Sequence, residues 1–280
     1  MPKQPQKSKI SSKEEPLRIL YIGDIMGKPG RKAVSALLPS LKKKHKTDLV
    51  IANAENLAHG KGISTGTIAE MQKAGVNFFT SGNHIWSKPE GLPILSRESS
   101  LVLRPANYPV GTPGTGEKVF PLGKNRILVI NLMGRVFMKE NLDCPFRALD
   151  SILERYKGED LAAILVDFHG EATSEKNAFA HYADGRVSAV VGTHTHIPTA
   201  DNRVLPKGTA YTSDIGMVGL LDSSIGIAVE PVIEAFLTQR PSKFTLPDSG
   251  RVVFNAVLIE IDATKKTARS ITRVQHEIEV

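Results

Sequence analysis

Five short apolar segments recur along the chain, and most are separated by segments with the spacing of amphipathic helices. Each apolar segment is bounded by glycine or polar residues, which is typical of a buried strand. The five segments are residues 17–22, 49–53, 76–81, 162–168 and 187–191. Strands with both faces buried are apolar throughout, whereas strands with one face in water alternate. The pattern therefore predicts an α/β fold in which helices cover both faces of the sheet.

The remaining elements follow from spacing and from residues that stop a helix. Helices are expected at residues 30–46, 65–74, 147–156 and 174–182. Pro39 complicates the first because proline removes a hydrogen bond inside a helix, and Gly75 ends the second. Further strands are expected at residues 126–131, 208–213 and 252–261. The last of these alternates and is expected at a sheet edge, and residues 88–124, rich in proline and glycine, predict loops with short elements.

The chain shows no internal repeat and no linker, so residues 17–280 are expected to form a single domain. Residues 1–16 are polar and rich in lysine, serine and proline, and they predict a disordered extension. That extension lacks the apolar region of a secretory signal, and no segment approaches the roughly 18 apolar residues of a membrane span. One cysteine, Cys144, excludes an intramolecular disulfide and a thiolate zinc cluster. We therefore expect a cytoplasmic protein without a membrane partner.

The net charge of +7 has two interpretations. It indicates either a surface that contacts RNA or a local excess of lysines with other causes. The lysines lie mainly in the extension (Lys3, Lys7, Lys9, Lys13) and at the end of the first helix (Lys42, Lys43, Lys44, Lys46). Cations at a helix C-terminus are favoured by the helix dipole, so we prefer the second interpretation and leave RNA contact open. A basic surface would also attract a phosphate ester.

Side chains that bind metal ions follow all five apolar segments. The ligand-type residues are Asp24, Glu55, Asn56, Asn83, His169, His194 and His196. If the strands share a sheet, their carboxyl ends converge on one crevice. Mixed imidazole and carboxylate sets suit Fe, Mn, Zn or Ni rather than Ca or Mg. Seven candidates are too many for one ion but suffice for two ions with a bridging carboxylate.

Taken singly, several of these residues have simpler interpretations. Asp24 could cap a helix, Asn56 and Asn83 could form turns, and His169 could lie at the surface. The pair around Thr195 is more informative, because residues two apart in an extended segment face the same way. Recurrence at five strand ends makes coincidence a poor explanation.

His84 follows a candidate ligand directly, at Gly82-Asn83-His84. It could therefore lie over the site without binding metal and act as a general acid. The rival catalytic motifs are missing from the sequence: Pro29 replaces the hydroxyl residue of a phosphate loop after Gly27-Lys28, and the glycine-rich dinucleotide fingerprint and the Gly-x-Ser-x-Gly elbow do not occur.

The ordered blocks resemble those of calcineurin-like metallophosphoesterases. The blocks are Gly23-Asp24, Asn53-Ala54-Glu55-Asn56, Gly82-Asn83-His84, His169 and Gly192-Thr193-His194-Thr195-His196. Longer stretches, among them Arg104-Pro105-Ala106-Asn107 and Asp167 to Lys176, are similar to the bacterial YmdB-like branch, whose members are phosphodiesterases active on 2',3'-cyclic nucleotides. The resemblance runs from Leu17 to past Glu230.

This resemblance implies a four-layered α-β-β-α sandwich with two metal ions. Asp24, Asn56 and His196 would hold one ion, and Asn83, His169 and His194 would hold the other. Glu55 would bridge the two ions, and His84 would be the general acid. Met26 stands where the superfamily usually has histidine, and Glu55 stands where it usually has aspartate. Both departures are shared with the YmdB-like branch, which implies iron, with Mn or Zn as alternatives.

The resulting hypothesis is a dinuclear phosphodiesterase in which a metal-bound hydroxide attacks a phosphodiester, with a 2',3'-cyclic nucleotide as the expected substrate. Two alternatives stay open: a phosphomonoesterase, such as a nucleotidase or protein phosphatase, and an RNA-binding regulatory protein with a metal site. Residues 88–116 and 133–146 are expected to shape the pocket. Arg104 and Arg135 could touch phosphate, although surface or structural ion pairs are the preferred interpretation, and a homo-oligomer is left open.

Overall fold

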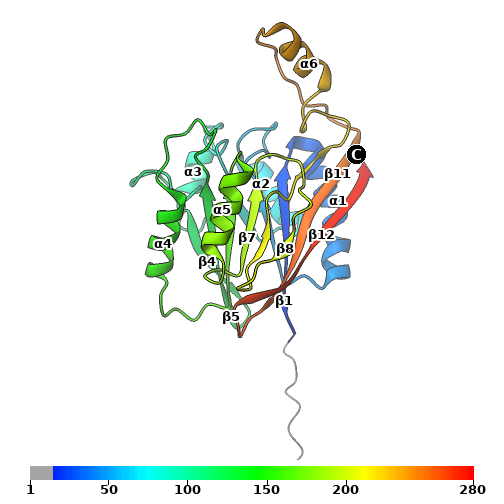
Figure 1. Ribbon diagram of the computed structural model, residues 1–280. Coiled ribbons are helices and arrows are strands. Elements are labelled where there is room, and N and C mark those ends of the chain that lie inside the picture. The colour runs from blue at the N-terminus through cyan, green and yellow to red at the C-terminus, as the bar shows by residue number, and fades with distance from the viewer. Residues whose placement is uncertain (1–14) are drawn as a thin grey trace, which may run out of the picture.

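Two six-stranded sheets form the middle of the molecule in this computed structural model, which describes residues 15–280 (Figure 1). The first sheet has the order β12-β11-β10-β1-β2-β3 and the second has the order β4-β5-β6-β7-β9-β8. The first comprises β1 (Leu17–Ile25), β2 (Leu49–Asn53), β3 (Phe78–Thr80), β10 (Met217–Leu220), β11 (Arg251–Asp262) and β12 (Thr267–Glu279). The second comprises β4 (Glu117–Leu122), β5 (Asn125–Met133), β6 (Ala163–His169), β7 (Ala189–Thr193), β8 (Arg203–Val204) and β9 (Ala210–Thr212).

Helices cover the outer faces of both sheets. They are α1 (Gly27–His45), α2 (Thr65–Ala74), α3 (Gly91–Leu95), α4 (Pro145–Arg155) and α5 (Thr173–Ala183). A further helix, α6 (Val229–Thr238), covers neither sheet. In Figure 1, α4 and α5 lie on one side of the paired sheets and α1 lies on the other. In the part of the chain that the structure describes, no helix is both long enough and apolar enough to cross a membrane.

Strand β1 shows how the layers arise from the sequence. Successive side chains of a strand point to opposite faces. Ile19 and Tyr21 belong to the core between the two sheets, whereas Leu20 and Ile22 belong to the core beneath α1 and α2. A third core lies between the second sheet and the helices α4 and α5. The four-layered α-β-β-α sandwich is therefore confirmed.

Several expectations about single elements were wrong. The segment expected at a sheet edge, β11, lies inside the first sheet, where it pairs with β12, β10 and β1. The edge is occupied instead by β12, which the sequence analysis did not identify, and β10 and α6 were also missed. The candidate ligands come from strands of two sheets and not from one.

Other boundaries agree closely. Strand β2 and helix α2 have the expected bounds, and α2 ends at Gly75 with a left-handed φ of 111°. Helix α1 begins at Gly27, three residues earlier than expected, and continues through Pro39. The lysines Lys42 to Lys44 lie in its last turn, as the helix-dipole interpretation requires. The disordered extension expected at residues 1–16 falls, up to residue 14, outside the described residues.

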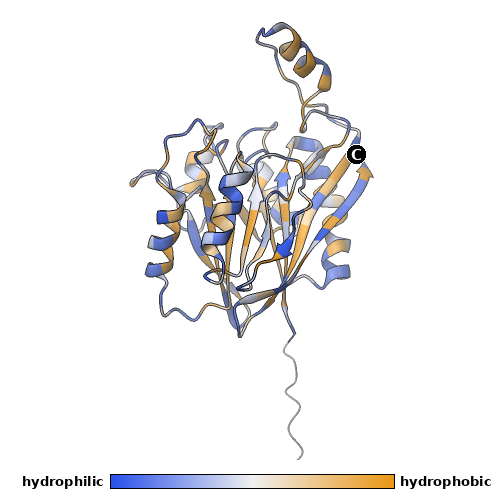
Figure 2. Cartoon of the chain, in the orientation of Figure 1, coloured by the Kyte–Doolittle hydropathy of each residue, from blue (hydrophilic) through white to orange (hydrophobic). Residues whose placement is uncertain are grey.

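Helix α6 differs from the other helices because none of its residues is buried. Figure 1 shows it projecting from the layered body, and Figure 2 shows most of it in hydrophobic colours. Phe236 and Leu237 are 76% and 80% exposed.

Candidate metal centre

The candidate ligands are carried by both sheets and meet between them. Asp24 is the penultimate residue of β1, His169 is the last residue of β6, and the others lie in loops after β2, β3 and β7. Contacts cross from one sheet to the other: the His194 amide donates to Asp24 Oδ2 over 3.2 Å, and Glu55 Oε1 lies 3.4 Å from His169 Nε2. The structure thus brings together strand ends that are far apart in the sequence.

Asn83, His169, His194 and Glu55 form a first group around His169 Nε2. This nitrogen lies 3.1 Å from Asn83 Oδ1, 3.0 Å from His194 Nδ1 and 3.4 Å from Glu55 Oε1. Glu55, His169 and His194 each offer one ligand atom, and these atoms lie within 4.8 Å of one another. Side chains able to donate electron pairs therefore face a common point, which is the chemistry of a transition-metal site.

Asp24, Asn56 and His196 form a second group. Nε2 of His196 lies 3.1 Å from Asn56 Nδ2 and 4.0 Å from Asp24 Oδ1. Asp24 is fully buried, and its Oδ1 has no hydrogen-bond partner among the described residues. A buried carboxylate oxygen is costly unless a donor or a cation satisfies it. The donor set therefore fits a metal ion beside Asp24.

Two of the histidines are oriented through their second ring nitrogen. His196 donates from Nδ1 to the Ile225 carbonyl over 2.9 Å, and His194 Nε2 lies 3.2 Å from a carboxylate oxygen of Glu171. Histidines that bind metal usually engage their other nitrogen in this way, which fixes the ring and its tautomer. His196 Nε2 and His194 Nδ1 are left as ligand atoms.

A buried chain of hydrogen bonds orients His169. Its Nδ1 lies 2.9 Å from the Thr193 hydroxyl, which donates to Asp167 Oδ1 over 2.7 Å. Thr193 and Asp167 are both fully buried. Their positions in the sequence gave no sign of this role, because a threonine and an aspartate in apolar strands meet only when β6 and β7 pair.

His84 contacts both groups. Its Nδ1 lies 2.9 Å from Asn56 Oδ1 and 3.1 Å from Glu55 Oε1, and its backbone amide donates to Glu55 Oε2 over 3.0 Å. Both side-chain contacts use Nδ1, so Nε2 is the nitrogen that can serve a substrate. The ring is 27% exposed, so solvent reaches the residue.

The charges of the centre depend on one another. Burial raises the pKa of Asp24 to about 6. Burial alone would raise the pKa of Glu55, but His169 and His84 outweigh it and hold that pKa well below its usual value. The carboxylates of Glu55 and Asp24 likewise outweigh burial and raise the pKa of His169 to about 9. Burial and the adjacent His169 lower the pKa of His194 to about 3. The surroundings of the first group therefore favour a single positive charge, on His169, beside a neutral His194.

Glycines allow the backbone to approach the centre. A Cβ at Gly82 would lie 2.2 Å from two ring atoms of His169 and 2.5 Å from Glu55 Oε2. A Cβ at Gly192 would lie 1.7 Å from the Ser213 carbonyl oxygen. The glycines that precede the ligand residues in the sequence blocks are thus required for space.

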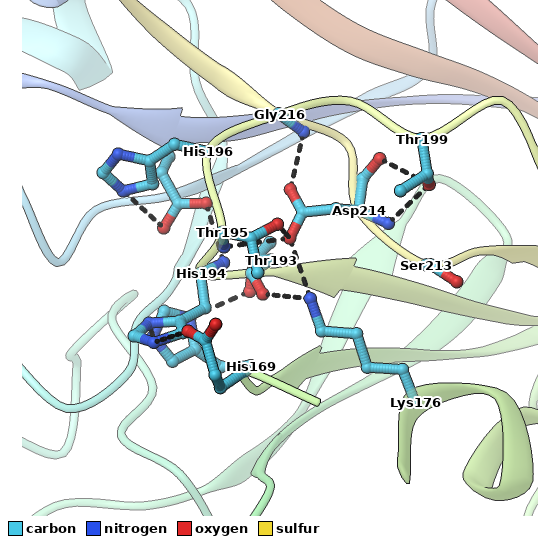
Figure 3. A network of polar contacts seen from close by, with 12 residues as sticks. His169, Lys176, Thr193, His194, Thr195, His196, Thr199, Ser213, Asp214 and Gly216 are labelled. Carbon is cyan, nitrogen blue, oxygen red and sulfur yellow. Dashed lines mark hydrogen bonds and ion pairs between the residues drawn. The ribbon is translucent and has the colours of Figure 1, made fainter. Parts of the chain in front are cut away.

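The His-x-His loop has an unusual backbone. His194 and His196 have positive φ angles of 100° and 66°. Non-glycine residues in such conformations cost about 1–3 kcal/mol each, and they persist only when their surroundings enforce them. Figure 3 shows the polar network around this loop.

The structure also decides between some simpler interpretations of single residues. The N-cap of α1 is Met26, without a side-chain cap, so Asp24 does not cap that helix. His169 is fully buried and is not a surface histidine. Arg104 has a structural role, since its guanidinium donates to the carbonyls of Pro105, Thr112 and Pro113.

A cavity of about 630 Å³ is lined by residues of the two segments expected to shape the pocket and by residues of α4. Its lining includes Tyr108, Arg135 and Arg147, but none of the candidate ligands. Trp86, two residues after His84, packs edge-to-face on Tyr108 with ring centroids 6.0 Å apart. The wall of the cavity therefore contacts, at Tyr108, the loop that carries His84.

Two sheets between helices, with candidate imidazole, amide and carboxylate ligands where their strands end, define a metallophosphoesterase fold. A family model described as YmdB-like protein matches residues 20–274, and the chain belongs to this family.

Similar proteins agree in length and in structure. A 2',3'-cyclic-nucleotide 2'-phosphodiesterase from Bacillus subtilis is 45% identical over 258 residues, which cover 92% of this chain and 96% of the relative. A crystal structure described as a novel phosphatase from Mycoplasma pneumoniae has a TM-score of 0.88 at 35% identity and covers 94% of each chain. A hypothetical protein from Thermus thermophilus has a TM-score of 0.87 at 45% identity and covers 93% of this chain and 99% of its own.

Proposed function

We propose that this protein is a dinuclear metal-dependent phosphodiesterase that hydrolyses 2',3'-cyclic nucleotides. The observation that carries the proposal is that the two groups of candidate ligands meet at His84, whose Nδ1 contacts Asn56 of the second group and the buried Glu55 of the first. Membership of the YmdB-like family and the Bacillus relative's activity support the diester and the cyclic nucleotide as substrate.

In this proposal Asn83, His169 and His194 would hold one ion, and Asp24, Asn56 and His196 would hold the other. Glu55 would serve both ions. Two bound metal ions supply Lewis acidity, which lowers the pKa of a water and neutralises the charge that builds on the phosphate. The set combines imidazole with hard oxygen ligands and contains no thiolate, which suits Fe, Mn or Zn. Iron is the proposed metal because the resemblance to the YmdB-like branch implies it, with Mn or Zn as alternatives.

His84 acts as the general acid in this proposal. Its Nδ1 is held by Asn56 and Glu55 over 2.9 and 3.1 Å, so the ring orientation is fixed before substrate binds. Its Nε2 delivers a proton to the ribose oxygen that leaves phosphorus, and the product is a nucleoside monophosphate. No covalent phosphoenzyme is required.

The first test is hydrolysis of bis-p-nitrophenyl phosphate by purified protein before and after chelation, with Mn or Fe then added back. Activity that disappears and returns supports a metal phosphodiesterase. Turnover of 2',3'-cyclic AMP should then exceed turnover of adenosine monophosphate and of p-nitrophenyl phosphate. Preference for the monoesters would favour the phosphomonoesterase alternative, and salt-sensitive RNA binding without turnover would favour the regulatory one.

Two narrower expectations stay predictions: a single domain over residues 17–280 and a cytoplasmic location. A homo-oligomer and contact with RNA stay open, and the basic last turn of α1 is explained equally by the helix dipole.

A further inference from the structure

The loop that carries His194 and His196 is held by a carboxylate that binds no candidate ligand side chain. Asp214 Oδ2 accepts hydrogen bonds from the Thr195 amide over 3.1 Å and from the Thr195 hydroxyl over 2.8 Å. Thr195 lies between the two histidines, so these bonds fix the middle of the loop (Figure 3). Asp214 is 1% exposed.

A buried lysine completes the arrangement. Lys176 of α5 is 2% exposed, and its Nζ donates to Asp214 Oδ2 and to the Thr193 carbonyl, over 2.8 Å each. Thr193 directly precedes His194, and Thr195 directly follows it. The ion pair therefore makes hydrogen bonds to the backbone on both sides of His194, as the dashed lines of Figure 3 show.

The turn that contains Asp214 also reaches the second group of ligands. Asp214 Oδ1 accepts from the Gly216 amide over 2.8 Å, and the Gly216 carbonyl accepts from the Asp24 amide over 3.2 Å. The next amide, that of Met217, donates to the His196 carbonyl over 2.9 Å. Asp214 is thus linked through backbone to both ligand groups.

Stability of the fold is a poor explanation for this ion pair. Removing two charges from water consumes most of their attraction, and apolar replacements of buried pairs are often neutral or stabilising. The loop, in contrast, needs restraint because two of its residues have positive φ angles. The ion pair of Lys176 and Asp214 supplies this restraint through its contacts with Thr193 and Thr195.

We propose that Lys176 and Asp214 are positioning residues that hold the His194–His196 loop in the conformation that binds metal. This inference rests on the proposed function, since it assumes that His194 and His196 are ligands. Outer residues that orient metal ligands typically change metal affinity by about 10–100-fold when they are replaced.

The test is the affinity of the K176M/D214N variant for Mn²⁺. It is measured by calorimetric titration of protein from which metal has been removed with a chelator. The double change removes both charges together, so neither is left buried and unpaired. We expect a folded protein, judged by circular dichroism and thermal unfolding, that binds Mn²⁺ about 10–100-fold more weakly. A folded variant with the parent's affinity would overturn the inference.

The chain offers a matched control pair. Arg186, shortly after α5, and Asp150 of α4 form an ion pair of 2.5 Å, and both side chains are more than a third exposed, at 35% and 43%. The R186M/D150N variant removes the same two charges away from the loop and should bind Mn²⁺ like the parent. A loss of affinity in the control equal to that in K176M/D214N would count against a specific role for the buried pair.

A milder variant decides the matter if the double variant does not fold. Thr195→Val removes only the hydroxyl that donates to Asp214 and leaves both charges in place. We expect it to fold and to bind Mn²⁺ several-fold more weakly, and unchanged affinity would contradict the inference. A parent protein that binds neither Mn²⁺ nor Fe²⁺ would instead refute the proposed function.

Discussion

His84 and the seven candidate ligands lie close together, but His84 is the one whose free nitrogen can face a substrate. We expect His84→Ala to lower turnover of the diester by about 10²–10⁴-fold, which is the usual contribution of a general acid. The metal content should stay at two ions per chain, measured by elemental analysis of the purified variant. Loss of metal together with activity would show that His84 is itself a ligand.

Asp201 provides a pH-dependent contribution to stability away from the ligands. Burial alone would raise its pKa, but hydrogen bonds from Ser213 and Thr199 outweigh burial and lower it. A carboxyl with a lowered folded pKa stabilises the protein above the unfolded pKa of about 4 and loses this contribution as the pH falls through the folded pKa. The free energy of unfolding of Asp201→Asn should therefore fall less between about pH 5 and about pH 3 than that of the parent.

Urea unfolding across this range measures the difference. Asp248→Asn is the control, because the Asp248 side chain is 78% exposed. A parent-like pH dependence in Asp201→Asn would show that the hydrogen bonds to Ser213 and Thr199 do not depend on the charge.

The backbone of the loop after β3 lies against the candidate ligands His169 and Glu55, and a substitution of Gly82 tests whether this close contact is required. Gly82→Ala would place a methyl group 2.2 Å from the His169 ring, so the ligands must move. Displacement of about 1 Å costs on the order of 10²-fold in activity, and we expect a loss of that size together with weaker Mn²⁺ binding.

Gly66→Ala is the matched control for this steric prediction. Gly66 lies in the first turn of α2, and a Cβ there has no neighbour within 4 Å. The control should keep its metal and unfold at a slightly higher temperature, since alanine favours a helix over glycine by up to about 1 kcal/mol. Full activity in Gly82→Ala would mean that the loop can shift to accommodate the methyl group without displacing the candidate ligands.

At the scale of elements, local signals decided what the sequence could predict. Helix α2 was predicted to the residue because Gly75 adopts the left-handed conformation that ends it. Strand β12 was missed because its exposed face carries polar residues along most of its length, and β10 was missed because it has four residues. Strand β11 lies inside the sheet because β12 pairs with its outer edge, and no local sequence pattern predicts this pairing.

The same distinction holds within the candidate site. The candidate ligands could be proposed from the sequence because each lies at or just after the end of a strand whose apolar pattern is local. Lys176 and Asp214 could not, because α5 and the turn after β9 meet only in the folded chain. A lysine in a helix is ordinarily exposed, so its burial at 2% is information that only the structure contains.

At the scale of the whole molecule, the proposed metal ions would join two sheets. Asp24, Asn56 and Asn83 follow strands of the first sheet, whereas His169 and His194 belong to the second. Chelation should therefore lower the midpoint of thermal unfolding, and each tenfold excess of free metal over the dissociation constant should restore about 1.4 kcal/mol. Calorimetry with graded Mn²⁺ measures this slope, and a midpoint independent of metal would contradict a site shared by the sheets.

Ligands divided between two sheets also have a consequence for the living cell. The unfolded fraction of a protein is what proteases degrade, and a change of 1–2 kcal/mol in stability alters abundance about several-fold. A cell short of the metal would then lose the protein itself and not only its activity. The amount of this enzyme in a cell would follow metal supply without any regulator of its gene.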